Sequence, residues 1–325
     1  MQSHNNINLI LKAPFLFCGV MQSHKRTWKY FTLILLSCLC HLTNQAQQNR
    51  STLRIGLMAD MQYADKADHG TRFYRNSLQK VDTAVRFFNQ QKVNFNVILG
   101  DLVDEGPKDF SQLNRYLINL NKPLYCLLGN HDYVNVTEPD QLHKIYNMPN
   151  SYYSFSKGEW RFIFLNTNEL SEYATQEGSP LRHQWELLVD SLQKSDRRNT
   201  QPWNGGLSHT QLNWLKIELS QAEKNKEKVI LFTHHPLLPE NGYEALNNNK
   251  VVEVINKSHA VKMVLSGHNH KGGSAVLANV PYITLEGMIE TPQENAYGVL
   301  ELYPNEIKII GIGRLQTRVF KITSP

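Results

Sequence analysis

Short apolar runs alternate with longer amphipathic stretches along the chain from Leu53 onward. Within residues 71–91, for example, Val81, Val85 and Phe88 recur at the spacing of one face of a helix. Ser208 precedes another periodic stretch and is a residue type that caps helix N-termini. The predicted helices are residues 71–91, 109–119, 141–146 and a helix after Ser208 with the apolar face Leu212, Leu215 and Leu219.

The apolar runs themselves have the length of buried strands. Residues 152–165 contain two such runs around Gly158, which predicts a hairpin at the start of a second sheet. Residues 171–206 are polar and irregular, and no linker or repeat divides the chain after residue 50. We therefore expect an α/β fold in which two sheets are flanked by helices in a single domain. The remaining predicted strands are residues 53–59, 94–99, 123–128, 229–232, 261–265, 282–285, 298–303 and 307–312.

Residues 1–46 have the features of a secretory leader. Residues 25–29 are basic, and residues 30–42 form an apolar stretch too short to cross a bilayer. The sequence Met-Gln-Ser-His occurs at residue 1 and again at Met21, so translation is expected to begin at Met21. Cleavage would release an exported domain, residues 47–325, without stable membrane insertion. The alternatives are an uncleaved anchor and a lipid attached to Cys38.

Charge gives no indication of a nucleic-acid partner. The chain has a formal net charge of +5, but four of its 34 Lys and Arg residues, and no Asp or Glu, lie in the leader. The rest of the chain therefore carries a net charge of about +1, and no basic stripe follows a predicted helix. Three of the four cysteines also lie in the leader. Cys126 is then left without an internal disulfide partner and is expected in the core.

Polar side chains follow five of the apolar runs, at the point where each predicted strand ends. Their Asp, Asn, Gln and His side chains are oxygen and nitrogen donors that suit divalent metals. If the strands run in the same direction, these donors converge on one rim of the fold. Each motif alone also fits an ordinary turn, and one of the two adjacent histidines at 234 and 235 is expected to be structural. The motifs are Asp60-Met61-Gln62, Gly100-Asp101-Leu102-Val103-Asp104, Gly129-Asn130-His131-Asp132, Thr233-His234-His235-Pro236 and Ser266-Gly267-His268-Asn269-His270.

This series resembles the calcineurin-like metallophosphoesterase family, whose motifs run Asp-x-His, Gly-Asp-x-x-Asp, Gly-Asn-His-Asp/Glu, His-x-Pro and Gly-His-x-His. Four of the five match, and the first departs because Gln62 replaces the usual His. That exchange, followed by Tyr-Ala-Asp, is similar to the manganese-dependent ADP-ribose/CDP-alcohol diphosphatase branch. The longer stretches that resemble this branch are residues 73–78, 203–208, 211–215, 267–273 and 284–292.

The resemblance implies a two-sheet metallophosphoesterase sandwich that holds two divalent metal ions. Gln62 would supply a neutral oxygen, which agrees with manganese. His131 would act on the departing oxygen, with Asp104 orienting its ring. The expected ligands are Asp60, Gln62, Asp101 and His270 for one metal, and Asp101, Asn130, His234 and His268 for the other. The expected substrate-binding positions, which could instead be simple turns, are Asn204, Gly205, Gly206, Gly272 and Gly273.

The reaction implied by the resemblance is hydrolysis of the pyrophosphate bond in ADP-ribose and in CDP-alcohols such as CDP-choline. The products would be a nucleoside monophosphate and a phosphorylated sugar or alcohol. Residues 66–72 are shorter than the corresponding segment of the branch, so selectivity for the base or distal sugar stays open. A phosphodiesterase or phosphomonoesterase of broad range on the same centre is the main alternative, and a non-catalytic binding domain is another. The physiological substrate and the oligomeric state stay open.

Overall fold

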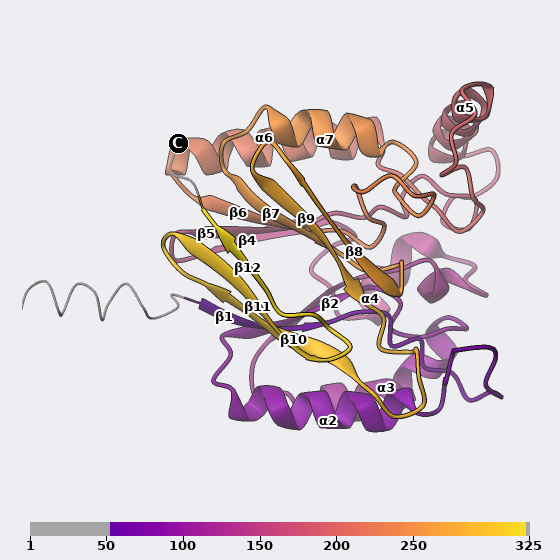
Figure 1. The fold of residues 1–325 in the computed structure, drawn as a ribbon. Helices are drawn as coiled ribbons and strands as arrows, with labels where there is room; N and C mark the ends of the chain where they lie inside the picture. Colours follow the sequence, from indigo (N-terminus) through magenta and orange to yellow (C-terminus); the bar gives the residue numbers. More distant parts are fainter. Residues whose placement is uncertain (1–52, 323–325) are drawn as a thin grey trace, which may run out of the picture. The chain divides into compact units, whose positions relative to one another are not determined.

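Two mixed sheets pack against each other in the computed structural model, which describes residues 53–322 (Figure 1). The first sheet has six strands in the order β12-β11-β10-β1-β2-β3. Strands β1, β2 and β3 are parallel, whereas β10, β11 and β12 are joined by antiparallel pairings. The strands are β1 Leu53–Met58, β2 Phe95–Leu99, β3 Leu124–Leu127, β10 Ala296–Leu302, β11 Glu306–Gly313 and β12 Arg318–Lys321.

The second sheet also has six strands, in the order β4-β5-β6-β7-β9-β8. Strands β5, β6, β7 and β9 are parallel, and the antiparallel strands β4 and β8 form its two edges. The hairpin predicted around Gly158 is therefore present as β4 and β5. The strands are β4 Tyr153–Lys157, β5 Trp160–Phe164, β6 Lys228–Phe232, β7 Val261–Ser266, β8 Lys271–Leu277 and β9 Val280–Glu286.

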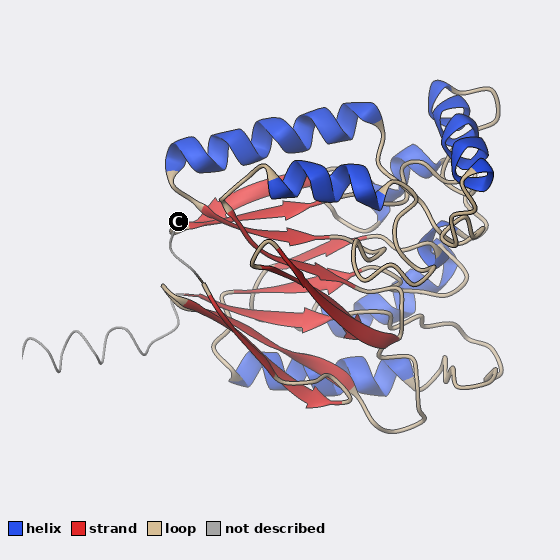
Figure 2. Cartoon of the chain, turned by 45° about the horizontal axis from the view of Figure 1, so that its top comes forward, coloured by secondary structure: helices blue, strands red, loops and turns tan. Residues whose placement is uncertain are grey.

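Helices cover the outer faces of both sheets (Figure 2). Helices α6 and α7 lie along the second sheet, and α2 and α3 lie against the first. As predicted, the Ser208 hydroxyl caps α6 by accepting a hydrogen bond from the backbone N–H of Gln211. The α-helices are α2 Ser77–Gln90, α3 Phe110–Leu117, α4 Leu142–Ile145, α5 Pro180–Lys194, α6 His209–Asn225 and α7 Asn248–Asn256. Short 3₁₀ helices occupy Pro107–Asp109, His131–Tyr133 and Pro139–Gln141.

The main core lies between the two sheets. Ile55 and Ile98 from the first sheet and Phe162 and Phe232 from the second belong to one buried cluster. A second cluster lies under α6 and includes Leu215, which is fully buried as its place on the predicted apolar face requires. Burial on both faces explains why the parallel strands read as continuous apolar runs. The prediction of two sheets flanked by helices is confirmed.

The prediction that residues 171–206 are irregular is wrong, because α5 spans Pro180–Lys194. Ser179 caps this helix and Pro180 occupies its first turn. Both residues are ordinary signals of a helix start. Only Leu192 of the helix is buried, so the apolar periodicity that reveals a helix is weak. Helix α7 and strands β8 and β12 were also missed, and α2 begins at Ser77 rather than residue 71.

The five motifs follow the carboxyl ends of parallel strands β1, β2, β3, β6 and β7. Backbone hydrogen bonds tie neighbouring strand ends together, from Asp60 N to Gly100 O at 3.2 Å and from Gly267 N to His234 O at 3.0 Å. The motifs are thereby held at one end of the sandwich. Within residues 53–322, no helix is long and apolar enough to cross a membrane. The leader predicted at residues 1–46, with Cys38, lies outside the described residues.

Candidate metal centre

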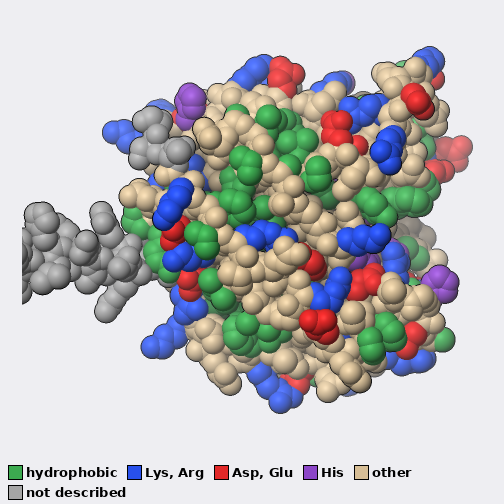
Figure 3. Space-filling view, viewed as in Figure 1, with side chains coloured by type: hydrophobic (Ala, Val, Ile, Leu, Met, Phe, Trp, Pro, Cys, Tyr) green, Lys and Arg blue, Asp and Glu red, His purple; other side chains and the backbone are tan. Residues whose placement is uncertain are grey.

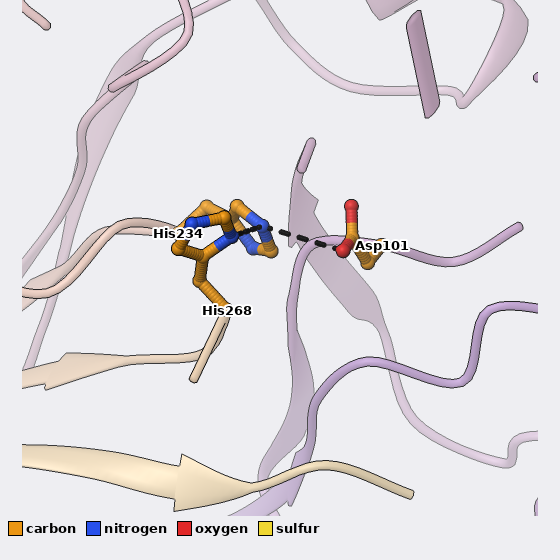
Figure 4. Close-up of side chains that lie close together, drawn as sticks. All are labelled: Asp101, His234 and His268. Carbon is orange, nitrogen blue, oxygen red and sulfur yellow. Dashed lines mark hydrogen bonds and ion pairs between the residues drawn. The ribbon is translucent and has the colours of Figure 1, made fainter. Parts of the chain in front are cut away.

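Asp101, His234 and His268 form the first of two donor groups. All three side chains are buried, and they come from the ends of β2, β6 and β7 (Figure 4). The Nε2 atom of His234 lies 3.5 Å from Oδ2 of Asp101 and 3.2 Å from Nδ1 of His268. Asn130 Oδ1 is 3.3 Å from the same His234 nitrogen. The structure thus brings together the four side chains expected at one of the two metals.

Asp60, Asp101 and His270 form the second donor group. In each group the donor atoms lie within 4.8 Å of one another, and Asp101 belongs to both. His270 Nε2 is 3.8 Å from Asp60 Oδ1, and the Gln62 amide nitrogen lies 3.2 Å from the same ring nitrogen. Gln62 also donates to Asp101 Oδ2 at 2.8 Å. One carboxylate between two sets of donors is the arrangement that a pair of cations requires.

Unpaired buried oxygens show that the centre fits cations. Asp60 Oδ2 and Gln62 Oε1 are buried and have no hydrogen-bond partner within the described chain. A buried polar atom without a partner is unfavourable, and a cation among these donors would supply that partner. A half-turn of the Gln62 amide would exchange its oxygen and nitrogen and direct the oxygen toward Asp101 and His270. Carboxylate, amide and imidazole donors suit manganese, iron and zinc.

Opposite charges stabilise the ionised form of the shared carboxylate. Burial alone would raise the pKa of Asp101, but the charges of His234 and His131 hold it well below its usual value. For Asp60, burial is the largest influence and raises the pKa. Asp101 therefore stays an anion between the two donor groups.

Four candidate ligands have a strained backbone conformation. Asp60, Gln62, Asp101 and His268 have φ values of 52°, 42°, 51° and 71°, in the left-handed region. Residues with a side chain rarely adopt this conformation, which costs free energy and persists where surrounding structure enforces it. Such strain occurs preferentially at functional sites, and here it coincides with four of the seven expected ligands.

Each candidate histidine is oriented through the ring nitrogen that faces away from the other donors. A partner on that nitrogen fixes the ring and leaves the opposite nitrogen for a metal. The three pairs are His234 Nδ1 with Leu99 O at 2.8 Å, His268 Nε2 with Asn204 Oδ1 at 3.0 Å, and His270 Nδ1 with Glu290 Oε1 at 2.8 Å.

His235 differs from its neighbour His234 because both of its ring nitrogens are engaged within the protein. Nδ1 lies 2.8 Å from the Thr167 hydroxyl and Nε2 lies 3.0 Å from the carbonyl of Trp203. Burial lowers the pKa of His235 to about 3, so the ring is neutral. With no free ring nitrogen, His235 is a structural residue.

His131 lies at the edge of the centre beside Asp104, as expected. Its Nδ1 is 3.0 Å from Asp104 Oδ1, and its side chain is 22% exposed. The backbone N–H of His131 donates to Asp101 Oδ1 at 2.9 Å. Lys66 forms an ion pair with the same Asp104 carboxylate. Asp104 therefore fixes the ring by one nitrogen and leaves Nε2 without a hydrogen bond to any of residues 53–322.

The expected substrate-binding positions are used largely within the protein. Asn204 is 2% exposed, and its amide nitrogen donates to the carbonyls of Asn199 and Gly242 while its oxygen meets His268. Its side chain has no atom left for a substrate. A Cβ at Gly205 would lie 2.4 Å from the Thr167 carbonyl, and one at Gly206 2.8 Å from Asn247. These two glycines allow close packing of the chain.

Gly272 and Gly273 lie in strand β8. Gly272 has a φ of 73°, and a Cβ there would lie 2.6 Å from the carboxylate of Glu286. Gly272 is therefore required by the backbone conformation. A Cβ at Gly273 would make only ordinary contacts of 3.7 Å. Nothing in the local packing demands glycine at residue 273.

Sequence reasoning missed two residues that support the centre. Glu290 follows β9 and holds His270, and Thr167 follows β5 and holds His235. Both lie in the loops that follow parallel strands, Glu290 after the end of β9 at Glu286 and Thr167 after the end of β5 at Phe164. Glu290 lies in the stretch 284–292 that resembles the diphosphatase branch, but nothing in that stretch names its partner, and Thr167 belongs to no motif.

Comparisons with known proteins agree with this geometry. The family profile described as calcineurin-like phosphoesterase matches residues 53–272. A manganese-dependent ADP-ribose/CDP-alcohol diphosphatase of Arabidopsis thaliana is 30% identical, with 82% of this chain and 96% of that protein covered. The human protein of the same name is 29% identical, with 81% and 91% covered.

A solved structure shows the same architecture. A dimetal phosphatase from Danio rerio aligns with a TM-score of 0.74 and 25% identity, and the alignment covers 84% of this chain and all of that one. Residues 53–272, the segment that the family profile matches, include all seven expected ligands and strands of both sheets. On these grounds the chain belongs to the calcineurin-like phosphoesterase family.

Proposed function

We propose that this protein hydrolyses the pyrophosphate bond of ADP-ribose and of CDP-alcohols such as CDP-choline, using two divalent cations, preferably manganese. The products are a nucleoside monophosphate and a phosphorylated sugar or alcohol. The names of the relatives in plants and vertebrates support the substrate class and the metal. The observation that carries the proposal is the pair of donor groups that share Asp101.

The metal ligands and His131 would have different roles in this reaction. When bound, two cations would lower the pKa of a water molecule and neutralise charge that develops on the phosphoryl oxygens. Asp101 would hold both ions, and Gln62 and Asn130 would complete the two sides with neutral oxygens. His131 lies outside both donor groups and is the group positioned to donate a proton to the departing oxygen. Asp104 keeps its ring in the required orientation.

The surface agrees with a small-molecule substrate. Acidic and basic side chains are interspersed on the face shown in Figure 3, and they form no continuous basic band there. Binding to nucleic acid depends on such a band because the phosphate backbone must be neutralised along its length.

The test measures hydrolysis of ADP-ribose, CDP-choline, a cyclic nucleotide and an aryl phosphate with added manganese, with product identification. AMP with ribose 5-phosphate, and CMP with phosphocholine, are the expected products. Turnover confined to the cyclic nucleotide or the aryl phosphate would instead indicate a phosphodiesterase or phosphomonoesterase of broad range. The His131→Ala variant should lose roughly 100-fold to 10,000-fold in kcat while it binds manganese as the parent does. Equal turnover by the two proteins would exclude the proposed role of His131.

We also propose that the mature protein is exported, and the basis is the leader in its sequence. Residues 25–29 and 30–42 have the charge and the length of a signal peptide. N-terminal sequencing of protein from the native host should find a start near residue 47. An intact Met21 would show that the leader is retained, and a lipid on Cys38 would show an anchored form.

A further inference from the structure

Arg72 lies opposite Glu290 at the edge of the metal centre and is a cationic side chain without a partner among residues 53–322. The residue is half-buried, and its guanidinium makes no ion pair or side-chain hydrogen bond with any of residues 53–322. Three cations around it, Lys66, Arg75 and Arg314, are engaged. Lys66 pairs with Asp104, Arg75 with Asp65, and Arg314 donates to the carbonyl of Gly287.

The backbone directs the Arg72 side chain toward the face of the metal centre. Arg72 and His69 exchange backbone hydrogen bonds of 3.0 and 3.1 Å across a tight turn. Arg72 also pairs with Glu290 in an antiparallel bridge, and the two hydrogen bonds that flank this pair are each 3.2 Å. Directly opposed residues of an antiparallel pair project to the same face. Glu290 Oε1 lies 2.8 Å from Nδ1 of His270, so this face is the one on which the expected ligand His270 lies.

Hydrogen bonds from Lys80 hold the segment that carries Glu290 in place. Lys80 of α2 is 4% exposed, and its ammonium donates to three carbonyls of this segment. The acceptors are Met288 O at 2.8 Å, Glu290 O at 2.9 Å and Thr291 O at 2.6 Å. The bridge partner of Arg72 is thereby fixed, and the position of Arg72 is fixed with it.

We propose that Arg72 binds the second phosphate of a pyrophosphate-linked substrate, the one that leaves when the bond breaks. This inference rests on the proposed function, because a substrate with one phosphate has no group to meet the arginine. A guanidinium donates two parallel hydrogen bonds to phosphate oxygens. Negative charge grows on the leaving phosphate in the transition state, so the contact strengthens there. Arg72 then makes the site selective for diphosphates over single-phosphate esters.

The test compares a diphosphate and a single-phosphate substrate at saturating manganese. In the Arg72→Gln variant, kcat/KM for ADP-ribose should fall roughly 100-fold, whereas that for bis(4-nitrophenyl) phosphate should change by less than about threefold. Arg72→Lys keeps the charge without the fork and should recover part of the loss. Arg75→Gln is the matched control because Arg75 is exposed and paired with Asp65, and it should leave both reactions unchanged.

An equal loss on both substrates, or no loss on either, would overturn the role of Arg72. Calorimetric binding of α,β-methylene-ADP in the presence of manganese gives a measurement that needs no turnover. Arg72→Gln should bind this diphosphate at least tenfold more weakly than the parent, and equal affinity would also overturn the proposal. A parent protein that binds the analogue but does not hydrolyse ADP-ribose would contradict the proposed function alone, and the binding comparison would still decide the role of Arg72.

Discussion

Gly129 lies against the shared carboxylate, and its replacement by alanine tests the geometry of the centre. A Cβ at this position would lie 2.1 Å from Asp101 Oδ1 and 2.5 Å from Cε1 of His234. Ordinary contacts begin at 3.4 Å, so one of these groups must move by about 1 Å. Asp101 cannot move freely, because it accepts hydrogen bonds from His131 N at 2.9 Å and from Gln62 at 2.8 Å.

The expected effect of Gly129→Ala follows from this displacement. A misplacement of about 1 Å in a reacting centre costs on the order of 100-fold in rate. Loss of a well-placed neighbour of a metal ligand weakens metal binding by about 10- to 100-fold. We therefore expect kcat/KM to fall about 100-fold and the manganese Kd to rise at least 10-fold. Overpacking should also lower the free energy of unfolding by about 1–3 kcal/mol.

Manganese titration by calorimetry and steady-state hydrolysis of ADP-ribose are the assays, with a thermal melt to confirm folding. Gly158→Ala is the control, since Gly158 lies in the β4–β5 turn with a φ of 63° and no atom of residues 53–322 lies within 4 Å of the added Cβ. It should cost about 1–2 kcal/mol of stability from its left-handed backbone and leave manganese binding unchanged. Normal metal affinity and turnover in folded Gly129→Ala would refute the placement of Asp101 between two ions.

Further predictions concern the support of the centre. Asn204→Ala should raise the manganese Kd about 10- to 100-fold by releasing His268 and leave KM nearly unchanged at saturating metal, whereas a raised KM would indicate substrate contact. Removing divalent ions with a chelator should abolish hydrolysis, and restoring manganese to 100 times its Kd should add about 2.7 kcal/mol to the free energy of unfolding. An unchanged melting temperature would contradict binding to the folded state. Lys80→Met leaves three carbonyls unpaired and should lower the free energy of unfolding, measured in urea at pH 7, by roughly 3 kcal/mol. Burial lowers the pKa of Lys80 to about 8, so the unfolded chain binds more protons above that pH. The stability of the parent relative to Lys80→Met should then rise between about pH 8 and pH 10, and a fall would contradict this sign.

The local pattern of the sequence was enough to locate most of the fold and the donors. Strands buried on both faces read as apolar runs, and the donors follow these runs directly, so both signals lie within a few residues. The resemblance then implied that Asp101 would be shared by two metals. The structure places it in both donor groups.

The apolar pattern of the sequence did not predict helix α5, which buries few side chains. Helix α5 has a capped start at Ser179, yet Leu192 is its only buried residue. An amphipathic stripe records contact with the core, and α5 makes almost none. The clearest local signal for this helix is therefore its start, where the Ser179 hydroxyl accepts a hydrogen bond from the backbone N–H of Arg182.

Tertiary structure alone decided which residues support the ligands. Glu290 meets His270, Asn204 meets His268, and Arg72 lies opposite Glu290, although these partners are between 20 and more than 200 positions apart in the chain. Nothing in their local sequence specifies these contacts, because each depends on how the two sheets pack and how the loops close over the strand ends. Local sequence is enough to identify the groups that can bind a metal, whereas the packing of the sandwich sets how each one is oriented.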